Sequence, residues 1–122
     1  FYGEIFKNKI REENVNCWLV NTGWIGGAYG SGKRIPIRET RAILSAVHNG
    51  LLDSCNYRHD KTFKFRVPYK VPGVSKSFMN PRLAWKDKAS FDIQAQKLVD
   101  MFAKNFEKYE PYVDANIIAA SM

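Results

Sequence analysis

The sequence predicts a mixed α/β chain with few strands and about three main helices. Apolar residues recur at helical spacing in 2–13, 37–48 and 88–109. The run CWLV at 17–20 is typical of a strand buried on both faces, and FKFRV at 63–67 alternates like a strand with one solvated face. Two or three strands are too few for a complete doubly wound sheet. We therefore expect the missing strands to come from sequence outside this chain.

The amino-terminal residues predict a helix, a strand and a long glycine-rich loop. Residues 2–13 carry apolar side chains on one helical face and charges opposite. They begin without a cap or a methionine, which we interpret as a sign that the chain is a fragment. The strand at 17–20 follows. The loop at 21–35 then contains five glycines, Gly23, Gly26, Gly27, Gly30 and Gly32.

Residues 37–48 predict a second helix. Pro36 can occupy its first turn, where a missing N–H costs nothing, and Asn49 with Gly50 provides a left-handed cap at its end. His48 lies in the last turn, where a cation favours the helix dipole, and we prefer that role to a catalytic one. The side chains expected to face a core are Ile37, Ile43, Leu44 and Val47.

The carboxy-terminal part predicts a short helix and a long one. Asn80 and Pro81 form an N-cap and first-turn proline that open a helical turn through Trp85. Residues 88–109 form an amphipathic helix, whereas 110–122 are weakly patterned. The apolar stripe of the long helix is expected to be core rather than a cofactor site, and it comprises Phe91, Ala95, Leu98, Phe102, Phe106 and Tyr109.

Length and composition fit one domain or a piece of a larger one. The 122 residues are 45% hydrophobic, and no apolar run approaches the roughly 20 residues of a membrane span. Cys17 and Cys55 lack metal-ligand spacing, so we expect free thiols of a reducing cytosol rather than a disulfide. His48 and His59 have no second ligand set beside them. No metal site built wholly from this chain is expected.

The net charge of +7 suits an anionic partner such as nucleic acid or a phosphorylated metabolite. The basic residues are spread along the chain, so a solvated basic surface explains the charge equally well. Basic and aromatic residues interleave at 63–66, FKFR. A small basic nucleic-acid-binding module is therefore the alternative function.

The stretch GAYGSGKR at 27–34 matches the P-loop pattern G-x-x-x-x-G-K-[ST] except at its last position. Arg34 stands where a hydroxyl should ligate Mg²⁺. Six residues separate the apolar run from Gly27, whereas a P-loop follows its strand at once. Lys33 also precedes the predicted helix start, so the helix N-terminus could not support a phosphate beside it. We reject a P-loop, and with it a stand-alone P-loop kinase.

What remains is a long glycine-rich loop after a predicted strand, ending in a basic pair and leading into a helix. Loops at the carboxyl ends of strands are common ligand sites in open α/β sheets. Arg34 offers a rigid fork for phosphate, ribose or a purine edge, and it can stack on a base. The alternative is a loop that merely wraps Trp24 for packing.

At this point the residues resemble a family. LVNTGWIGGAYGSGKRIPIRETRAILSAVHNG at 19–50 resembles the carboxy-terminal segment of ATP-dependent phosphoenolpyruvate carboxykinases, with the pattern VNTGW-x-GG-x-YG-x-GKRI. The stretches 65–74 and 80–109 resemble the family more loosely, and Asn80 stands where the family usually has Asp. The resemblance covers about 17–109.

The resemblance implies a parent enzyme that converts oxaloacetate and ATP to phosphoenolpyruvate, ADP and CO₂ in gluconeogenesis, in the cytoplasm, using Mg²⁺ with Mn²⁺. Residues 1–122 would be the carboxy-terminal portion of its nucleotide-binding domain, a single-domain fragment. The resemblance assigns nucleotide contacts to Arg34, Ile35 and Thr40. Arg34 would pack its guanidinium against the base or ribose, Ile35 would contribute a backbone contact, and Thr40 would form a hydrogen bond.

The resemblance also implies what lies elsewhere. The family's P-loop, metal ligands and substrate arginines lie upstream, so no catalytic or metal-binding residue is expected in this chain, and the fragment is expected to be inactive alone. Its expected partners are ATP or ADP, the remainder of the parent chain and, in the full enzyme, oxaloacetate and phosphoenolpyruvate. Neither nucleic acid nor a membrane is expected.

Overall fold

The computed structural model describes residues 2–121. Its helices are α1 Tyr2–Glu13, α2 Ile37–His48, α3 Lys76–Met79, α4 Pro81–Ala84, α5 Lys88–Phe106 and α6 Ala115–Ala120, with a 3₁₀ helix at Glu110–Tyr112. Its strands are β1 Trp24–Ile25, β2 Lys33–Arg34, β3 Tyr57–His59 and β4 Arg66–Pro68. The mixed α/β prediction and the three main helices α1, α2 and α5 are confirmed.

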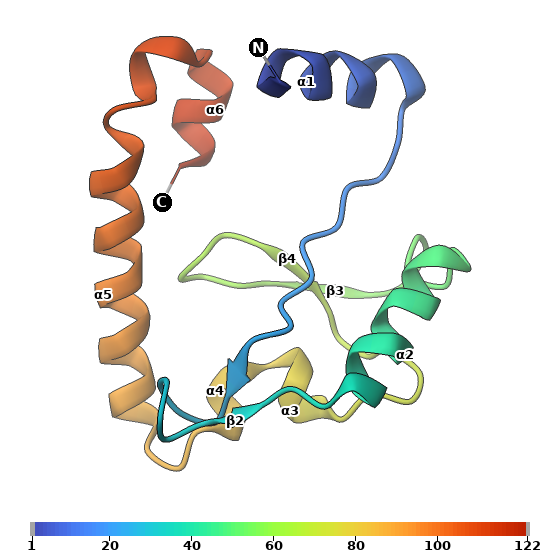
Figure 1. Cartoon of the computed structure of the whole chain (residues 1–122), viewed down its shortest axis with the longest axis vertical. Coiled ribbons are helices and arrows are strands. Elements are labelled where there is room, and N and C mark those ends of the chain that lie inside the picture. Colours follow the sequence, from blue (N-terminus) through green and yellow to red (C-terminus); the bar gives the residue numbers. More distant parts are fainter. Residues whose placement is uncertain (1, 122) are drawn as a thin grey trace.

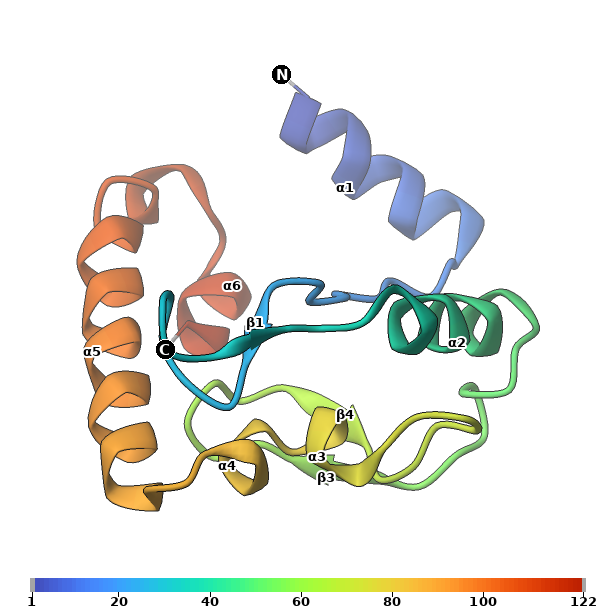
Figure 2. The same ribbon diagram turned by 60° about the horizontal axis from the view of Figure 1, so that its bottom comes forward.

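The elements form an open frame rather than stacked layers. Helix α5 runs along one edge and α2 lies at the opposite edge, with the strands between them (Figure 1). The same order from edge to edge is visible after a 60° turn (Figure 2). Strands β1 and β2 form one antiparallel pair, and β3 and β4 form another. The two ends of the described chain meet where Lys7 of α1 binds Asp114 before α6, at 3.0 Å.

Two predicted strands need correction. Residues 17–20 do not form a strand, and their side chains alternate between exposed and half-buried. A strand buried on both faces requires hydrogen-bonded neighbours on each side, and the described residues provide none there. Only the end of the predicted strand 63–67 is extended, because the chain turns at Lys64, which has φ of 57°. The sequence analysis missed both hairpins and α6.

Helix α2 follows the prediction closely. Pro36 is its N-cap rather than its first helical residue, with φ of −61° and ψ of 143°. At the other end Gly50 has φ of 68°. The N–H of Gly50 donates to the carbonyl of Val47, and that of Leu51 donates to Ala46, both at 3.0 Å. These two bonds make a Schellman cap, so the predicted left-handed cap is confirmed.

The core is small. Ala46, Leu52 and Val71 form one buried cluster. Two α2 side chains predicted to face a core do not, since Ile37 is 72% and Leu44 is 49% exposed. They lie seven residues apart on one face of the helix, while the core takes the neighbouring face. The partly buried residues around the cluster are Trp18, Ile43, Val47, Cys55, Val74 and Met79.

The apolar stripe of α5 is only partly core. Ala95 is buried and Phe91 and Phe106 are half-buried, but the other three members of the stripe are exposed. Beside its carboxy-terminal half lies an open apolar groove between α5, α6 and the tip of the β3–β4 hairpin. The aromatic side chains that line this groove are Phe63, Phe65, Phe102, Phe106 and Tyr109.

The chain exposes far more surface than a compact protein of its size. Its accessible area is 9748 Å². A compact monomer of 14.0 kDa exposes about 6,700 Å², so the excess is about 3,000 Å². Cys17 and Cys55 are both free thiols, as predicted. Within residues 2–121, no helix is long and apolar enough to cross a membrane.

The start of α5 depends on one carboxylate. Asp87 is the N-cap, and it accepts hydrogen bonds from the hydroxyl of Ser90 and from the N–H of Ala89 at 3.0 Å. These bonds, the Ser90 bond first, hold the pKa of Asp87 below its usual value of 3.8. Because the helix favours the ionised form, Asp87 stabilises α5 above that usual value and loses the effect as pH falls through the lowered one.

We therefore predict that the helicity of a peptide of residues 86–106 falls as the solution is acidified below about pH 4. Circular dichroism from pH 7 to pH 2 measures the change. The peptide also contains Asp92 and Asp100, so the control is the Asp87→Ala peptide. The control should start less helical and lose less helicity on acidification. Equal losses in the two peptides would contradict a role for the Asp87 cap.

Candidate functional site

The stretch 27–34 forms the turn and second strand of a β-hairpin. Strand β1 pairs with β2 in the register Trp24 with Arg34 and Ile25 with Lys33. Within the turn, the N–H groups of Ser31 and Gly32 donate to the carbonyl of Ala28 at 3.0 and 2.8 Å. These donors are therefore engaged inside the loop, whereas a P-loop points its N–H groups at a phosphate.

The position of Lys33 also argues against a P-loop. Lys33 lies in β2, and the next helix begins only at Ile37. A P-loop lysine stands at the start of the helix whose N-terminus supports the phosphates. The structure thus supports the rejection of a P-loop made from the sequence.

Two glycines close the hairpin by direct backbone approach. A Cβ at Gly32 would lie 2.5 Å from the carbonyl oxygen of Gly27 and 2.9 Å from that of Ile25. A Cβ at Gly27 would in turn lie 2.8 Å from the nitrogen of Gly32. No side chain fits at either position without moving the backbone. The glycines therefore shape the loop rather than cradle a ligand.

The three predicted nucleotide contacts occupy one short stretch from β2 into α2. Arg34 is exposed and makes no salt bridge or hydrogen bond within residues 2–121. Ile35 is half-buried, and its N–H donates to the carbonyl of Gly23 at 2.9 Å. A backbone contact from Ile35 to a ligand must then come from its carbonyl. Thr40 is half-buried in the first turn of α2.

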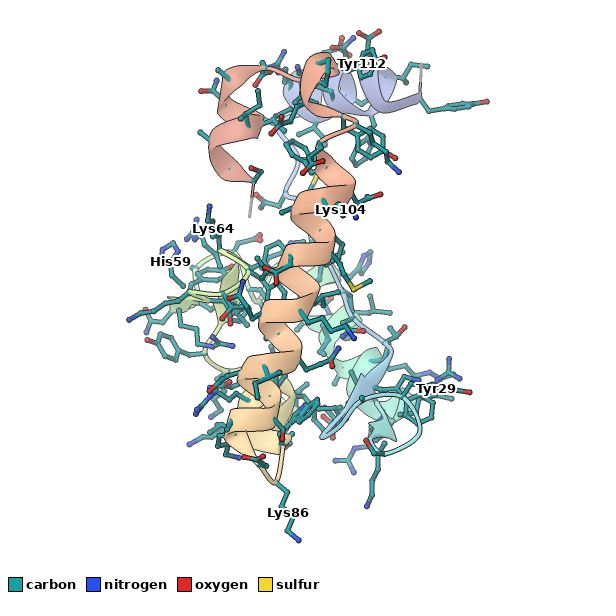
Figure 3. The ribbon with its side chains drawn as sticks, turned by 90° about the vertical axis from the view of Figure 1, so that its left-hand side faces the viewer. Tyr29, His59, Lys64, Lys86, Lys104 and Tyr112 are labelled. Carbon is teal, nitrogen blue, oxygen red and sulfur yellow. The ribbon has the colours of Figure 1, made fainter. Side chains whose placement is uncertain are left out.

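Trp24 is a residue whose place the sequence analysis did not establish. It lies opposite Arg34 in the register and is 43% exposed. Its ring meets that of Tyr29 edge to face, with centroids 5.3 Å apart at 80°. Tyr29 is 86% exposed and projects from the loop into solvent (Figure 3). The signal that could have located Trp24 is its spacing from Arg34 across the glycine turn. That spacing is compatible with two paired strands, and this register could have been tested from the sequence.

The described residues do not fit a metal centre. Between residues 2 and 121 no group of three or more His, Cys, Asp and Glu side chains gathers closely enough to hold an ion. The site is instead cationic and aromatic, with Arg34 opposite Trp24 in the register of the hairpin that leads into α2. Such groups can bind an anionic or planar ligand.

These features define the class of protein: a mixed α/β chain with an open surface and a cationic glycine hairpin that is not a P-loop. A family model described as phosphoenolpyruvate carboxykinase matches residues 1–77. The chain belongs to the phosphoenolpyruvate carboxykinase family.

Curated relatives are similar in sequence to almost the whole of this chain. The chain is 53% identical over 116 residues to a phosphoenolpyruvate carboxykinase (ATP) of Brucella suis, which covers 95% of this chain and 22% of the relative. It is 50% identical over 121 residues to the Ruegeria pomeroyi protein of the same name, covering 99% and 23%. The Parvibaculum lavamentivorans protein of that name is 51% identical over 120 residues, covering 98% and 22%. The chain thus spans about a fifth of the length of these relatives.

The close glycine contacts give a testable prediction for the full-length enzyme. Gly32→Ala should open the hairpin, because the added Cβ meets two carbonyl oxygens, at a local cost of about 1–3 kcal/mol. Hydrogen exchange of the peptide spanning 23–35 should become faster. Gly30→Asn is the matched control, since nothing lies within 4 Å of its Cβ and Asn tolerates its φ of 88°. Equal protection in Gly32→Ala and wild type would contradict the close packing.

Proposed function

We propose that this chain is the carboxy-terminal portion of the nucleotide-binding domain of an ATP-dependent phosphoenolpyruvate carboxykinase. The parent enzyme converts oxaloacetate and ATP to phosphoenolpyruvate, ADP and CO₂, a carboxy-lyase step of gluconeogenesis in the cytoplasm. In this proposal Arg34, Ile35 and Thr40 contact the adenosine end of the nucleotide. The observation that carries it is the unpaired guanidinium of Arg34 at the end of a hairpin that cannot act as a P-loop.

The geometry supports the adenosine end over the phosphates. Two of the loop N–H groups, those of Ser31 and Gly32, already donate to the carbonyl of Ala28. The guanidinium of Arg34 is planar, so it can lie against a base or donate in pairs to base and ribose oxygen and nitrogen atoms. Thr40 follows within one helical turn of the hairpin and carries a hydroxyl that can donate or accept.

Phosphoryl transfer needs parts that the described residues do not contain. Its charge is neutralised by metal ions and cations held in line with the reacting phosphate. Residues 2–121 hold no acidic or histidine cluster that fits Mg²⁺ or Mn²⁺. We place the metal ligands, the P-loop and the oxaloacetate site in the remainder of the parent chain, and we assign no catalytic residue here.

Photolabelling of the full-length parent tests the assignment. An azido-ATP carrying the reactive group on its adenine ring should label residues within 33–41, as mapped by mass spectrometry. Excess ATP should suppress the labelling, and excess oxaloacetate should not. The same preparation must decarboxylate oxaloacetate only when ATP is present. Labelling confined to other parts of the enzyme, or activity independent of ATP, would overturn the proposal.

The alternative of a nucleic-acid-binding module receives no support. Phe63 and Phe65 stack on each other at the hairpin tip, with centroids 6.4 Å apart, and both line the groove beside α5. The matches along the chain are to carboxykinases. In our proposal the positive charge belongs to a basic surface with a nucleotide partner.

A further inference from the structure

The hairpin register places two side chains closer together than sequence spacing suggests. The N–H of Ile35 donates to the carbonyl of Gly23, one step beyond the pair of Trp24 and Arg34. Hydrogen-bonded and non-hydrogen-bonded pairs alternate along an antiparallel ladder. Trp24 and Arg34 therefore form a non-hydrogen-bonded pair. Their side chains share one face of the hairpin, with Cα atoms about 4.5 Å apart, the closest approach that such a ladder provides.

The indole of Trp24 is itself held in place. Tyr29 packs against it edge to face from the turn. Next to it, Gly26 brings the hairpin backbone against α4, since a Cβ there would lie 3.2 Å from the carbonyl oxygen of Ala84. The turn is closed by the approach of Gly27 and Gly32. The backbone that carries the indole is thus held by close contacts, while the ring itself remains partly exposed to solvent.

Arg34, by contrast, has no restraint from a charged partner among the described residues. A long, mobile side chain loses conformational freedom when it binds a ligand, and this loss weakens binding. A guanidinium that lies on an aromatic face keeps its charge and its donors while it loses much of that freedom in advance. Trp24 is the aromatic side chain that the register places next to Arg34.

We propose that Trp24 is a positioning residue that orients the guanidinium of Arg34 towards the nucleotide base. The inference rests on the proposed function, because it gives Arg34 a nucleotide to bind. Trp24 acts through Arg34 and needs no contact of its own with ATP. The effect should fall on ATP binding and leave oxaloacetate binding unchanged.

The test uses the full-length enzyme with Trp24→Leu, Trp24→Phe, Arg34→Ala and the double variant Trp24→Leu/Arg34→Ala. We expect Trp24→Leu to raise KM for ATP about 3- to 20-fold. The KM for oxaloacetate should not change, and Trp24→Phe should recover most of the ATP affinity because it restores an aromatic face. The matched control is Phe65→Leu, which removes a stacked contact with Phe63 in the other hairpin, β3–β4. It should leave KM for ATP unchanged.

The double variant separates positioning from direct contact. If Trp24 works through Arg34, its replacement should add nothing once Arg34 is alanine, so the double variant should match Arg34→Ala. Additive losses would overturn the proposal, as would an unchanged KM for ATP in Trp24→Leu. A loss in Trp24→Phe equal to that in Trp24→Leu would overturn it too. If Arg34→Ala itself leaves ATP binding intact, the proposed nucleotide site fails together with the inference.

Discussion

The isolated 122-residue chain is expected to unfold without a cooperative transition and to show no ATP-dependent decarboxylation of oxaloacetate. Within residues 2–121 the buried hydrophobic side chains of the core are Ala46, Leu52, Val71 and Ala95. Three of them form the single cluster, so most of the chain is held by short local contacts. A core of this size cannot offset the conformational entropy of ordering more than a hundred residues.

The excess surface indicates what completes the fold. About 3,000 Å² more area is exposed than a compact monomer of this mass shows, which is the size of an obligate interface. Much of the exposed area is apolar, including the aromatic groove between α5, α6 and the β3–β4 tip. We infer that the remainder of the parent chain covers this surface.

Urea unfolding followed by tryptophan fluorescence and circular dichroism measures this prediction. The isolated chain should show broad, non-coincident transitions, and the full-length enzyme should show a steep one. The enzyme also serves as the positive control for ATP-dependent turnover. A single steep transition in the isolated chain, or any turnover above that of a boiled sample, would contradict the expectation.

The sequence was sufficient where structure is decided locally. Helix α2 was predicted with its bounds because its apolar period, its proline entry and its Asn49–Gly50 exit all act within a few residues. The starts of α5 and of the turn at Pro81 were also predicted, although α5 ends at Phe106 rather than at 109 and the turn ends at Ala84 rather than at Trp85. These elements need no distant partner to be specified.

The sequence was insufficient where structure depends on partners. The run 17–20 has the composition of a buried strand but finds no neighbour in the described residues. Ile37 and Leu44 are apolar yet exposed for the same reason. In the site, the rejection of a P-loop followed from local residue types and spacing. The pairing of Trp24 with Arg34 did not, because it depends on how the chain turns between 26 and 32.

Replacement of Arg34 by alanine in the full-length enzyme is expected to raise KM for ATP about 10- to 100-fold, the loss that follows removal of a charged hydrogen-bonding group. The maximal rate should change less, because our proposal assigns the phosphates and the metal ions to other parts of the enzyme. Arg34→Lys should recover little of the affinity, since an ammonium keeps the charge but not the planar fork.

The neighbouring residue supplies the control. Lys33 also carries a positive charge, but its side chain points to the other face of the two-strand ladder, because successive side chains alternate. Lys33→Ala should therefore leave KM for ATP near the wild-type value. If Lys33 were a P-loop lysine, its replacement by alanine would instead lower both the ATP affinity and the rate. Steady-state kinetics at several ATP concentrations distinguish the two variants. A large rise in KM for ATP in Lys33→Ala, with a small rise in Arg34→Ala, would indicate that the glycine loop binds the nucleotide. That result would refute the adenosine-side assignment.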